Sequence, residues 1–253
     1  MKELVNIPEN YQPQQTCLAN KTILITGAGD GIGAVAAKTF ANYGATVILL
    51  GKTIPKLEKV YDEIIAVGSP QPAIYPLNLE GAKDTDYLTL AETIEKEFGC
   101  LDGLLHNAAM FGGLIPIEQF DVSLWAQIVQ INLHAPFLLS KALIPVMKKS
   151  QNASMVFTSS GVAHEGRAYW GAYGVTKAAG DNLMGILANE LEVNTSIRVN
   201  SIDPGRVRTR MRALAFPGED PNTVPSPEEI MNAYLYLMSD DSSNVNGEIV
   251  VAY

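Results

Sequence analysis

The sequence has few cysteines and few histidines, and these shortages exclude whole classes of protein. Cys17 and Cys100 are its only cysteines; they lie far apart and form neither a CxxC pair nor a metal-ligand spacing, so we expect reduced thiols in a cytoplasmic protein. Its three histidines, His106, His134 and His164, are scattered along the chain. A metal site is therefore not expected.

Basic residues and long apolar runs are also scarce. Lys and Arg together number 18 against 27 Asp and Glu, and the net charge of −9 argues against nucleic acid or an anionic membrane as a partner. No segment approaches the roughly 18 continuous apolar residues of a membrane span. Residues 1–18 carry Asn, Gln, Pro and Glu, so we expect a polar N-terminal arm and no secretory signal peptide.

The remaining residues, 19–253, show the pattern of one large α/β domain. Short β-branched runs alternate with stretches in which apolar residues recur at helical spacing. Strands are expected at 22–26, 46–50, 73–77, 101–106, 154–158, 197–202 and 249–251, and helices at 32–43, 55–67, 86–98, 123–149 and 172–193. This alternation indicates a Rossmann-type, doubly wound parallel sheet of about seven strands with helices on both faces.

Prolines mark where some of these helices should bend or begin. Pro136 and Pro145 should bend or interrupt the helix at 123–149, because proline lacks an amide donor and clashes with the preceding turn. Residues 205–225 are expected to be irregular. Ser226, a capping residue followed by proline, then starts the last helix.

A glycine-rich loop follows the strand at 22–26. It reads TGAGDGIG at 26–33 and lies where a strand passes into a helix. Glycines there permit a tight turn and close approach of a pyrophosphate, and the helix N-terminus offers amide donors to its oxygens. An ordinary glycine-rich turn is the alternative, since isolated glycine motifs are weak signals. The strand-to-helix context favours a dinucleotide phosphate site.

The end of the next strand bears on the choice of cofactor. An acidic side chain there bonds the 2′-hydroxyl of NAD, but here the position holds Gly51, followed by Lys52. This favours NADP(H), with NAD(H) as the alternative. Asp30, inside the glycine loop, opposes that choice because a carboxylate repels a 2′-phosphate. Lys52 also has a plainer interpretation, as a solvated surface residue.

A candidate catalytic set follows the strand at 154–158. Ser160 lies just beyond that strand, and Tyr173 and Lys177 lie one turn apart on one face of the next helix. All three can meet at the carboxyl edge of the sheet, where ligands bind in open α/β folds. A Tyr-x-x-x-Lys pair alone is a weak signal, so the order of the motifs is the stronger argument.

Several motifs occur in a characteristic order along the chain. They are TGAGDGIG at 26–33, HNAA at 106–109, Asn132, Ser160, YGVTK at 173–177, RVN at 198–200 and PGRVRT at 204–209. This ordered set resembles the short-chain dehydrogenase/reductase superfamily in its common single-domain form, over nearly the whole chain. Within it, the stretches at 43–52, 156–161, 171–177 and 215–221 are most similar to the uncharacterised YciK-like oxidoreductases of bacteria.

The resemblance implies a role for each residue of the catalytic set. Tyr173 is the acid/base, Ser160 binds the substrate oxygen, Lys177 holds the nicotinamide ribose, and Asn132 anchors a relay water. A lysine cation about 4 Å from a tyrosine, at an effective dielectric of about 20, contributes roughly 4 kcal/mol and lowers its pKa by about 3 units. Purely structural roles are the alternative for Ser160 and Asn132.

The resemblance also implies which residues bind the cofactor. They are Gly27, Gly29, Asp30, Gly31, Ile32, Gly33, Gly51, Lys52, Asn78, Leu79, Asn107, Ala108, Tyr173, Lys177, Pro204, Gly205, Val207 and Thr209. The chain departs from the family at Ala109, where glycine is usual, and at Asn78, where aspartate is usual. Both changes are small and would weaken cofactor binding without abolishing it. Five residues between Ser160 and Tyr173 are expected to border the substrate pocket, with exposed loop or subunit-contact positions as the alternative for some of them: His164, Glu165, Arg167, Tyr169 and Trp170.

These motifs predict an NADP(H)-dependent oxidoreductase that transfers a hydride between nicotinamide and a small carbonyl or alcohol substrate. The alternative is a non-catalytic, redox-sensing dinucleotide-binding module on the same fold. The intact Asn132, Ser160, Tyr173 and Lys177 argue against that alternative, because a sensor needs no acid/base pair. By resemblance we expect a homotetramer or a homodimer.

Four arginines alternate at positions 206, 208, 210 and 212. One hypothesis is that Arg208 and Arg212, four residues apart, recruit an anionic substrate or the cofactor phosphates. The alternative is that these arginines are solvated or paired with neighbours such as Glu219 and Asp220.

Overall fold

All strands of the described chain lie in one sheet. The structure is a computed structural model that describes residues 4–253, and these residues form eight parallel strands in the order β1-β8-β7-β6-β5-β2-β3-β4. The strands are β1 Leu4–Asn6, β2 Thr22–Thr26, β3 Thr46–Gly51, β4 Ala73–Pro76, β5 Gly103–His106, β6 Ala153–Thr158, β7 Ile197–Asp203 and β8 Ile249–Val251. Strands β2, β5, β6 and β7 are buried throughout, as expected of a parallel sheet covered on both faces.

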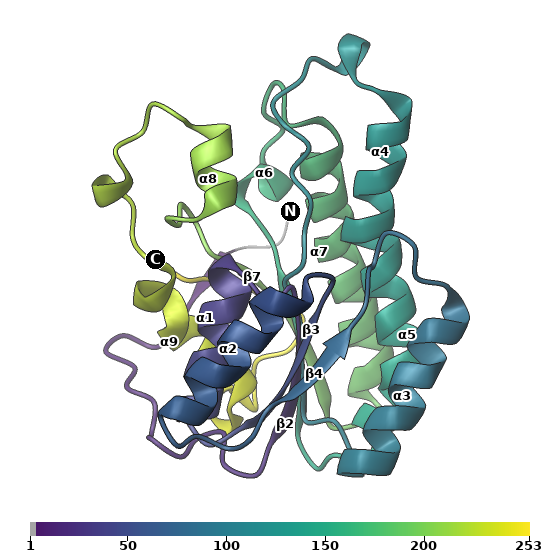
Figure 1. The fold of residues 1–253 in the computed structure, drawn as a ribbon, viewed down its shortest axis with the longest axis vertical. Helices are drawn as coiled ribbons and strands as arrows, with labels where there is room; N and C mark the ends of the chain where they lie inside the picture. The colour runs from purple at the N-terminus through teal and green to yellow at the C-terminus, as the bar shows by residue number, and fades with distance from the viewer. Residues whose placement is uncertain (1–3) are drawn as a thin grey trace.

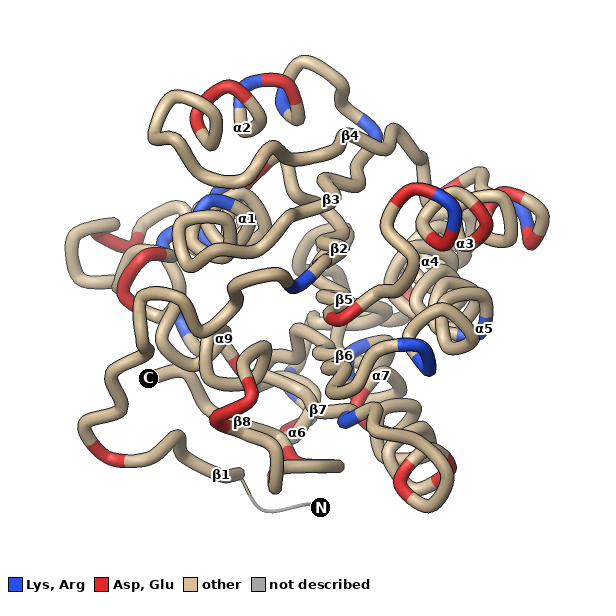
Figure 2. Tube along the Cα trace, turned by 90° about the horizontal axis from the view of Figure 1, so that it is seen from below, with Lys and Arg blue, Asp and Glu red and all other residues tan. Residues whose placement is uncertain are grey.

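Helices cover both faces of this sheet (Figures 1 and 2). One layer holds α1 Gly31–Asn42, α2 Ile54–Ala66 and α9 Met231–Met238, and the other holds α3 Asp84–Phe98, α4 Val122–Val129, α5 Ala135–Met147 and α7 Gly171–Glu192. Each layer builds its own apolar core against the sheet, with Phe40 and Tyr234 fully buried in the first and Tyr87 in the second. The predicted Rossmann-type, doubly wound architecture is therefore confirmed.

The N-terminal arm adds one strand to the predicted seven. Within the stretch 1–18, predicted as a polar arm ahead of the domain, Leu4–Asn6 forms β1 and pairs with β8 at the edge of the sheet. Tyr11 then packs edge-on against Tyr236, with ring centroids 5.0 Å apart. An open sheet edge offers hydrogen bonds to any short segment, so apolar patterning does not reveal such a strand. The start of the arm, at 1–3, lies outside the described residues.

The long helix predicted at 123–149 is continuous, with Pro145 inside α5, but its hydrogen-bonding pattern changes just before Pro136. It runs from α4 through a π-helical turn at Gln130–His134 into α5. Pro136 has no N–H to give to the carbonyl of Asn132, and the widened turn accommodates this loss. By length and mean hydropathy alone, Val122–Met147 would suffice to cross a membrane, although polar residues interrupt it and it contains no long continuous apolar run. In the fold this helix packs against α3 and α7, within the same helical layer on one face of the sheet.

Two short helices at the carboxyl edge of the sheet are not predicted by the apolar pattern. α6, Gly161–His164, follows β6, and α8, Arg210–Ala215, lies within the stretch predicted to be irregular. Helices of four to six residues are too short to show an apolar period, and Thr209, which caps α8, is the one local signal. Single turns of 3-10 helix occupy Ile117–Gln119, Pro221–Thr223, Pro227–Ile230 and Asp240–Ser242. The third follows Ser226 and leads into α9.

Candidate active site

The predicted site residues lie along the carboxyl edge of the sheet. Gly27 follows β2, Gly51 ends β3, Asn107 follows β5 and Ser160 follows β6. Strands β2 and β5 are neighbours in the sheet, but the chain leaves β2 towards β3 on one side and continues from β5 to β6 on the other. Ligands of open α/β sheets bind at such a reversal of strand order. The fold therefore brings the predicted residues to the edge where a dinucleotide would bind.

Glycines make the loop after β2 too tight for side chains. A Cβ on Gly33 would lie closer than 3.0 Å to the carbonyl oxygen of Gly27 and to Nδ2 of Asn107. Gly27 has a left-handed φ of 69°, and a Cβ there would meet the Cα of Ala108 at 3.0 Å. The loop packs backbone against backbone, and the first turn of α1, with Ile32, presents its free amides at the sheet edge. Such a cradle fits the pyrophosphate of a dinucleotide.

Thr26 joins this loop to the turn after β5. Its hydroxyl oxygen accepts hydrogen bonds from the amides of Asn107 (2.9 Å) and Ala108 (3.0 Å), and the hydroxyl donates to the carbonyl of Leu105. The Asn107 side chain donates in turn to the Thr26 carbonyl at 3.2 Å. Two segments that the sequence predicts separately as cofactor-binding are thus held as one unit.

Asp30 forms an ion pair with Lys56, a residue absent from the sequence-based prediction. One oxygen of Asp30 accepts the Gly31 amide at 2.8 Å, and the other pairs with Nζ of Lys56. The hydrogen bond from Lys56 is the main reason why the pKa of Asp30 lies below its usual value. Lys56 lies in the first turn of α2, and its Cβ occupies the space that a side chain on Gly29 would need. In the sequence, the only sign of a role for Lys56 was that it is a cation shortly after the strand β3.

Lys52, Asn78 and Leu79 follow the two strands that lie beside β2 on one side, β3 and β4. Lys52 follows β3 and is exposed to solvent. Asn78, where the family usually has aspartate, keeps an acceptor role, because its Oδ1 accepts the amide of Glu80 at 3.3 Å. The carbonyl of Leu79 accepts a hydrogen bond from the Gln130 side chain at 3.4 Å. The change from aspartate to asparagine therefore leaves this turn intact.

The residues predicted after β7 lie on the other side of the glycine loop. They are Pro204, Gly205, Val207 and Thr209. Gly205 has a left-handed φ of 67°, and the ring of Tyr253 packs so closely over it that a Cβ there would clash. A Cβ on Gly31 would meet Cγ2 of Thr209 at 3.7 Å. The start of α8 thus lies against the glycine loop.

Tyr173 and Lys177 are buried together, one turn apart on α7. Each is less than a tenth exposed, and Nζ of Lys177 lies 5.6 Å from the centre of the Tyr173 ring. Nζ donates a hydrogen bond to the carbonyl of Thr158 at 2.6 Å. Ser160, just beyond β6, lies close enough to Tyr173 to act on the pKa of its hydroxyl. The structure brings these three predicted catalytic side chains together.

Burial dominates the ionisation of this pair. Burial raises the pKa of Tyr173 to about 12, against the opposing effect of the Ser160 side chain, and lowers the pKa of Lys177 to about 8, against the nearby carboxylate of Asp181. The predicted lowering of the Tyr173 pKa by Lys177 is therefore outweighed. The physical reason is desolvation of both groups, together with the orientation of Nζ towards the Thr158 carbonyl.

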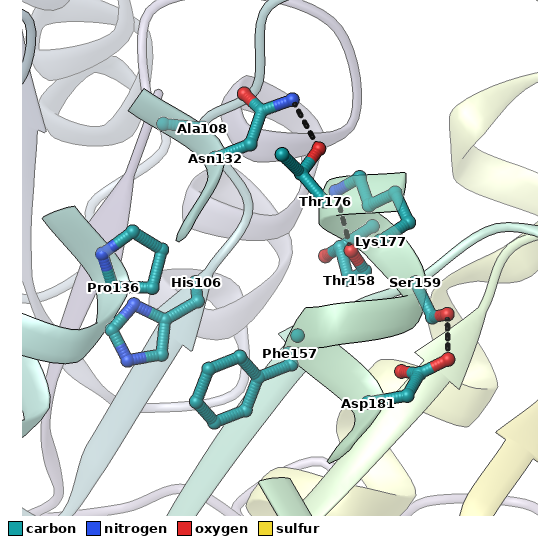
Figure 3. Close-up of a pocket in the computed structure, with 11 residues that line it drawn as sticks. His106, Ala108, Asn132, Pro136, Phe157, Thr158, Ser159, Thr176, Lys177 and Asp181 are labelled. Carbon is teal, nitrogen blue, oxygen red and sulfur yellow. Dashed lines mark hydrogen bonds between the residues drawn. The ribbon is translucent and has the colours of Figure 1, made fainter. Parts of the chain in front are cut away.

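Asn132 is held by its neighbours in the middle of the long helix (Figure 3). Its Nδ2 donates to the carbonyl of Met110 (2.9 Å) and to the Thr176 hydroxyl (3.1 Å), and its Oδ1 accepts the Met110 amide (2.8 Å). Beside it, a cavity of about 20 Å³ is lined by Lys177 and Asp181 among others. That volume suits one water molecule and excludes a substrate.

A further cluster of ionisable groups lies behind Ser160. His164, expected at the border of the substrate pocket, lies between the carboxylates of Asp181 (3.8 Å) and Asp203 (3.7 Å). Asp181 also accepts a hydrogen bond from the Ser159 hydroxyl at 2.6 Å, and burial raises the pKa of Asp203. These contacts join α6, α7 and the end of β7. They hold in place the elements that carry the predicted catalytic residues.

Aromatic side chains surround Tyr173 on its remaining side. Phe111 and Trp170 each lie 5.8 Å from the Tyr173 ring, and Phe216 lies 6.2 Å from Trp170, measured between ring centroids. We call these four residues the aromatic cluster. Phe111 follows β5, Trp170 precedes α7 and Phe216 follows α8, so no local sequence pattern could show that they meet. They form the apolar wall of the site.

Of the four alternating arginines, only Arg212 reaches this wall. Its guanidinium stacks on Phe216 at 3.8 Å and forms two hydrogen bonds of 2.6 Å to the carboxylate of Glu219. Arg208, its expected partner in binding anions, is exposed, as are the arginines at 206 and 210. Arg212 is therefore paired with a neighbouring carboxylate, as the alternative to anion recruitment predicts.

The sequence and the structure both match known proteins over most of their length. Residues 21–220 match the family model described as short chain dehydrogenase. The chain is 44% identical to the uncharacterised oxidoreductase YciK of Escherichia coli K12 over 238 residues, which cover 94% of each protein.

Two solved structures also match. One is a short chain dehydrogenase of Shigella flexneri complexed with NADP, and the other is one of Escherichia coli CFT073 complexed with NADPH. Both are 44% identical to this chain with TM-scores of 0.92; the matches cover 94% and 95% of this chain and 99% of each of those chains.

Proposed function

The chain belongs to the short-chain dehydrogenase/reductase superfamily, and from this premise we propose that it is an NADP(H)-dependent oxidoreductase of a carbonyl or alcohol substrate. The predicted resemblance to YciK-like oxidoreductases is confirmed by the identity to YciK. The observation that carries the proposal is the burial of Tyr173 and Lys177 beside Ser160, on the same sheet edge as the glycine cradle.

The reaction needs a hydride and a proton, and these come from different sources. When bound, the cofactor supplies the hydride. In the proposed reduction the carbonyl oxygen would take the proton of the Tyr173 hydroxyl while the carbonyl carbon would take the hydride, which together would give the alcohol and the oxidised cofactor. Ser160 hydrogen-bonds the same oxygen as charge develops on it.

Lys177 supports the proton transfer through its charge. With a pKa of about 8, it is largely protonated at neutral pH. Besides the hydrogen bond to the Thr158 carbonyl, its ammonium group has two further N–H donors. A cation here favours the tyrosinate that forms when Tyr173 gives up its proton, and so offsets the cost of burial.

A preference for NADP(H) is supported by the charges around the glycine loop. Lys56 neutralises Asp30, the residue that opposed NADP(H) on sequence grounds, and Lys52 lies exposed at the adjacent strand end. The resulting local charge is positive, which suits a 2′-phosphate. The complexes of two similar proteins with NADP and NADPH point the same way.

The rival function is a redox-sensing module that binds the dinucleotide without turnover. A sensor has no use for a buried Tyr173 and Lys177, and burying a lysine this deeply lowers its pKa at a cost in stability. We therefore favour the enzyme. Its single catalytic domain comprises residues 19–253 together with the arm strand β1, which belongs to the same sheet. We propose the cytoplasm as its location, which suits free thiols.

A homo-oligomer is supported by the outer face of the long helix and α7. Phe137, Val175 and Ile186 are each about half exposed there, and only 33% of the most apolar window of Val122–Met147 is buried. Phe137→Asp with Ile186→Asp should reduce the mass in light scattering to that of the 27.3 kDa monomer. Val67→Asp, on the opposite layer, is the matched control; a monomeric wild type would refute the proposal.

The decisive experiment measures consumption of NADPH and NADH with a panel of ketones, aldehydes, quinones and acyl thioesters. Tyr173→Phe should lower turnover by about 10²- to 10⁴-fold in a folded protein, because it removes the proton donor. Tyr87→Phe is the matched control, since its buried hydroxyl makes no hydrogen bond within residues 4–253 and lies in α3. Substantial activity in Tyr173→Phe would refute the mechanism.

A further inference from the structure

The aromatic cluster gives the reacting end of the site an apolar wall without charge. Phe111 and Tyr173 are each 7% exposed, and Val162 and Ala215 pack beside them at 8%. Met211 and Trp170 complete the same group of contacting side chains. Every member of this group is apolar or aromatic, so a substrate beside Tyr173 exchanges water for hydrocarbon and aromatic surfaces.

The geometry of the cluster is that of aromatic recognition. Phe111 meets Tyr173 edge-to-face, at 85° between ring planes, and Trp170 meets Tyr173 and Phe216 at tilts of 47° and 41°. Ring centroids 5.3 to 6.2 Å apart lie within the range of favourable aromatic pairs. A flat ring that enters this group finds faces and edges at several orientations, whereas an aliphatic ring finds only hydrophobic contact.

The backbone before α7 holds Trp170 in this position. Tyr169 has a left-handed φ of 73°, which is strained for a tyrosine, and its carbonyl accepts a hydrogen bond from the Ile115 amide at 3.0 Å. Gly171 follows with a φ of 33° and contacts Phe120 so closely that a Cβ would clash. Strain of this kind persists where the surroundings require one conformation, and it clusters at functional sites.

The nearest cation to the cluster is neutralised. Arg212 stacks on Phe216, but both of its hydrogen bonds to Glu219 are 2.6 Å long, and each side chain of the pair is only 20% exposed. Hydrogen bonding to Arg212 lowers the pKa of Glu219, so the carboxylate stays ionised at neutral pH. An anionic substrate would have to compete with an ideal bidentate partner for this guanidinium.

We propose that the substrate is a neutral, flat aromatic carbonyl compound, such as an aryl aldehyde, whose ring packs against the partly exposed Trp170 and Phe216 while its oxygen meets Tyr173. This inference rests on the proposed function, because it names the substrate class of the same site. Glu219 acts as a specificity-determining residue, since it withholds Arg212 from anions.

The first test compares NADPH-dependent reduction of 4-methylbenzaldehyde and cyclohexanecarbaldehyde. The measured quantity is the ratio of the two kcat/KM values, in wild type and in Trp170→Leu, so that the intrinsic reactivity of each aldehyde cancels. Trp170→Leu should lower the aromatic-to-aliphatic ratio about tenfold. Trp125→Leu, which removes the other tryptophan of the chain, packed on Phe120, should leave the ratio unchanged. An unchanged ratio in Trp170→Leu would overturn the proposal.

The second test concerns charge. Glu219→Gln should raise kcat/KM for 4-formylbenzoate relative to 4-methylbenzaldehyde at least about fivefold, because it frees the Arg212 guanidinium for a carboxylate. Glu165→Gln is the matched control, since it removes an exposed carboxylate paired with Arg167. A wild type that prefers 4-formylbenzoate, or a Glu219→Gln variant with an unchanged ratio, would contradict the proposal.

A binding measurement separates this proposal from the proposed function. In Trp125→Phe the only tryptophan is Trp170, so its fluorescence reports occupancy of the aromatic cluster directly. Titration with 4-methylbenzyl alcohol should quench it, and cyclohexylmethanol should do so much less. Quenching without turnover of any compound of the carbonyl panel above would refute the proposed function alone, whereas turnover of carbonyl compounds without quenching would refute the aromatic substrate class alone.

Discussion

The two halves of the sheet edge are built in opposite ways. The half that we propose binds the nucleotide (the nucleotide half) lies around β2, α1 and the turn after β5 and is made mainly of backbone. Glycines at 27 and 33 leave no room for side chains, and the Thr26 hydroxyl joins the two segments by accepting hydrogen bonds from main-chain amides. The substrate half is made of side chains that come from after β5, before α7, within α7 and after α8. The shape of the nucleotide half depends on the absence of side-chain atoms at its glycines. The shape of the substrate half depends on the packing of aromatic side chains.

This difference extends to the energetics of the two halves. In the nucleotide half the charges are exposed and paired, as in Asp30 and Lys56. Nearer the substrate half the ionisable groups are buried, and burial shifts the pKa values of Tyr173 and Lys177 towards their neutral forms. Substitutions that add volume should therefore have their largest effect in the nucleotide half. Changes in the burial of ionisable groups should have theirs nearer the substrate half.

The largest effect should come from adding one carbon to the nucleotide half. Gly33→Ala should destabilise the protein by about 3 to 5 kcal/mol and abolish NADPH binding, because its Cβ would meet the Gly27 carbonyl and Asn107. Gly81→Ala, where nothing lies within 4 Å of the new atom, should change stability by less than about 0.5 kcal/mol. Urea unfolding and calorimetric titration measure both; equal effects would show that the close contacts of Gly33 do not make the nucleotide half sensitive to added volume.

The second effect tests desolvation at the centre of the edge. His106 ends β5, is fully enclosed, contacts the Ser140 hydroxyl at 2.9 Å, and has its pKa lowered to about 3 by burial. Below about pH 6.5 the unfolded chain binds a proton at this residue, whereas the folded chain does not until about pH 3. The free energy of unfolding therefore decreases as the pH is lowered from about 6.5 to about 3. Between pH 7 and pH 4 the loss is about 3 kcal/mol for this group.

His106→Asn removes that titration and keeps a hydrogen-bonding side chain beside Ser140. The variant should lose about 3 kcal/mol less stability than the wild type between pH 7 and pH 4, measured as free energies of unfolding in urea. Parallel pH dependences in the two proteins would show that burial of His106 does not contribute to acid sensitivity.

The third effect tests whether charge in the nucleotide half acts on the cofactor. Lys56→Met should weaken NADPH binding about tenfold and NADH binding little, because it removes a cation and leaves the Asp30 carboxylate unpaired. Lys59→Met, on the same helix and 78% exposed, is the matched control. Calorimetry with both cofactors decides the matter, and an equal loss for NADPH and NADH would mean that Lys56 does not sense the 2′-phosphate.

The smallest effect concerns the one strained backbone position of the substrate half described above. Tyr169→Gly should be more stable than Tyr169→Ala by about 1 kcal/mol, because glycine tolerates a left-handed φ and alanine does not. Thermal unfolding of the two variants measures the difference. If alanine proved the more stable residue, the strain assigned to Tyr169 would be absent, and Trp170 would be held by packing alone.

The seven strands predicted from sequence were found because they are short apolar runs, most of them rich in β-branched residues, between stretches of helical spacing. β1 escaped detection because it is an edge strand of three residues, and α6 and α8 because they are shorter than two helical turns. In the nucleotide half the predicted glycines lie where expected, since glycine spacing encodes backbone geometry locally. Lys56 was missed because only the folding of α2 against the loop brings it to Asp30.

By itself the sequence determined the order of strands and helices, the glycine cradle and the placement of Tyr173 and Lys177 on one helical face, because each depends on residues close together in the chain. The tertiary structure alone decided which charges are neutralised, how strongly the catalytic pair is desolvated, and which aromatic rings meet. Those properties depend on distances between residues far apart in sequence, and electrostatic and packing energies change steeply with such distances.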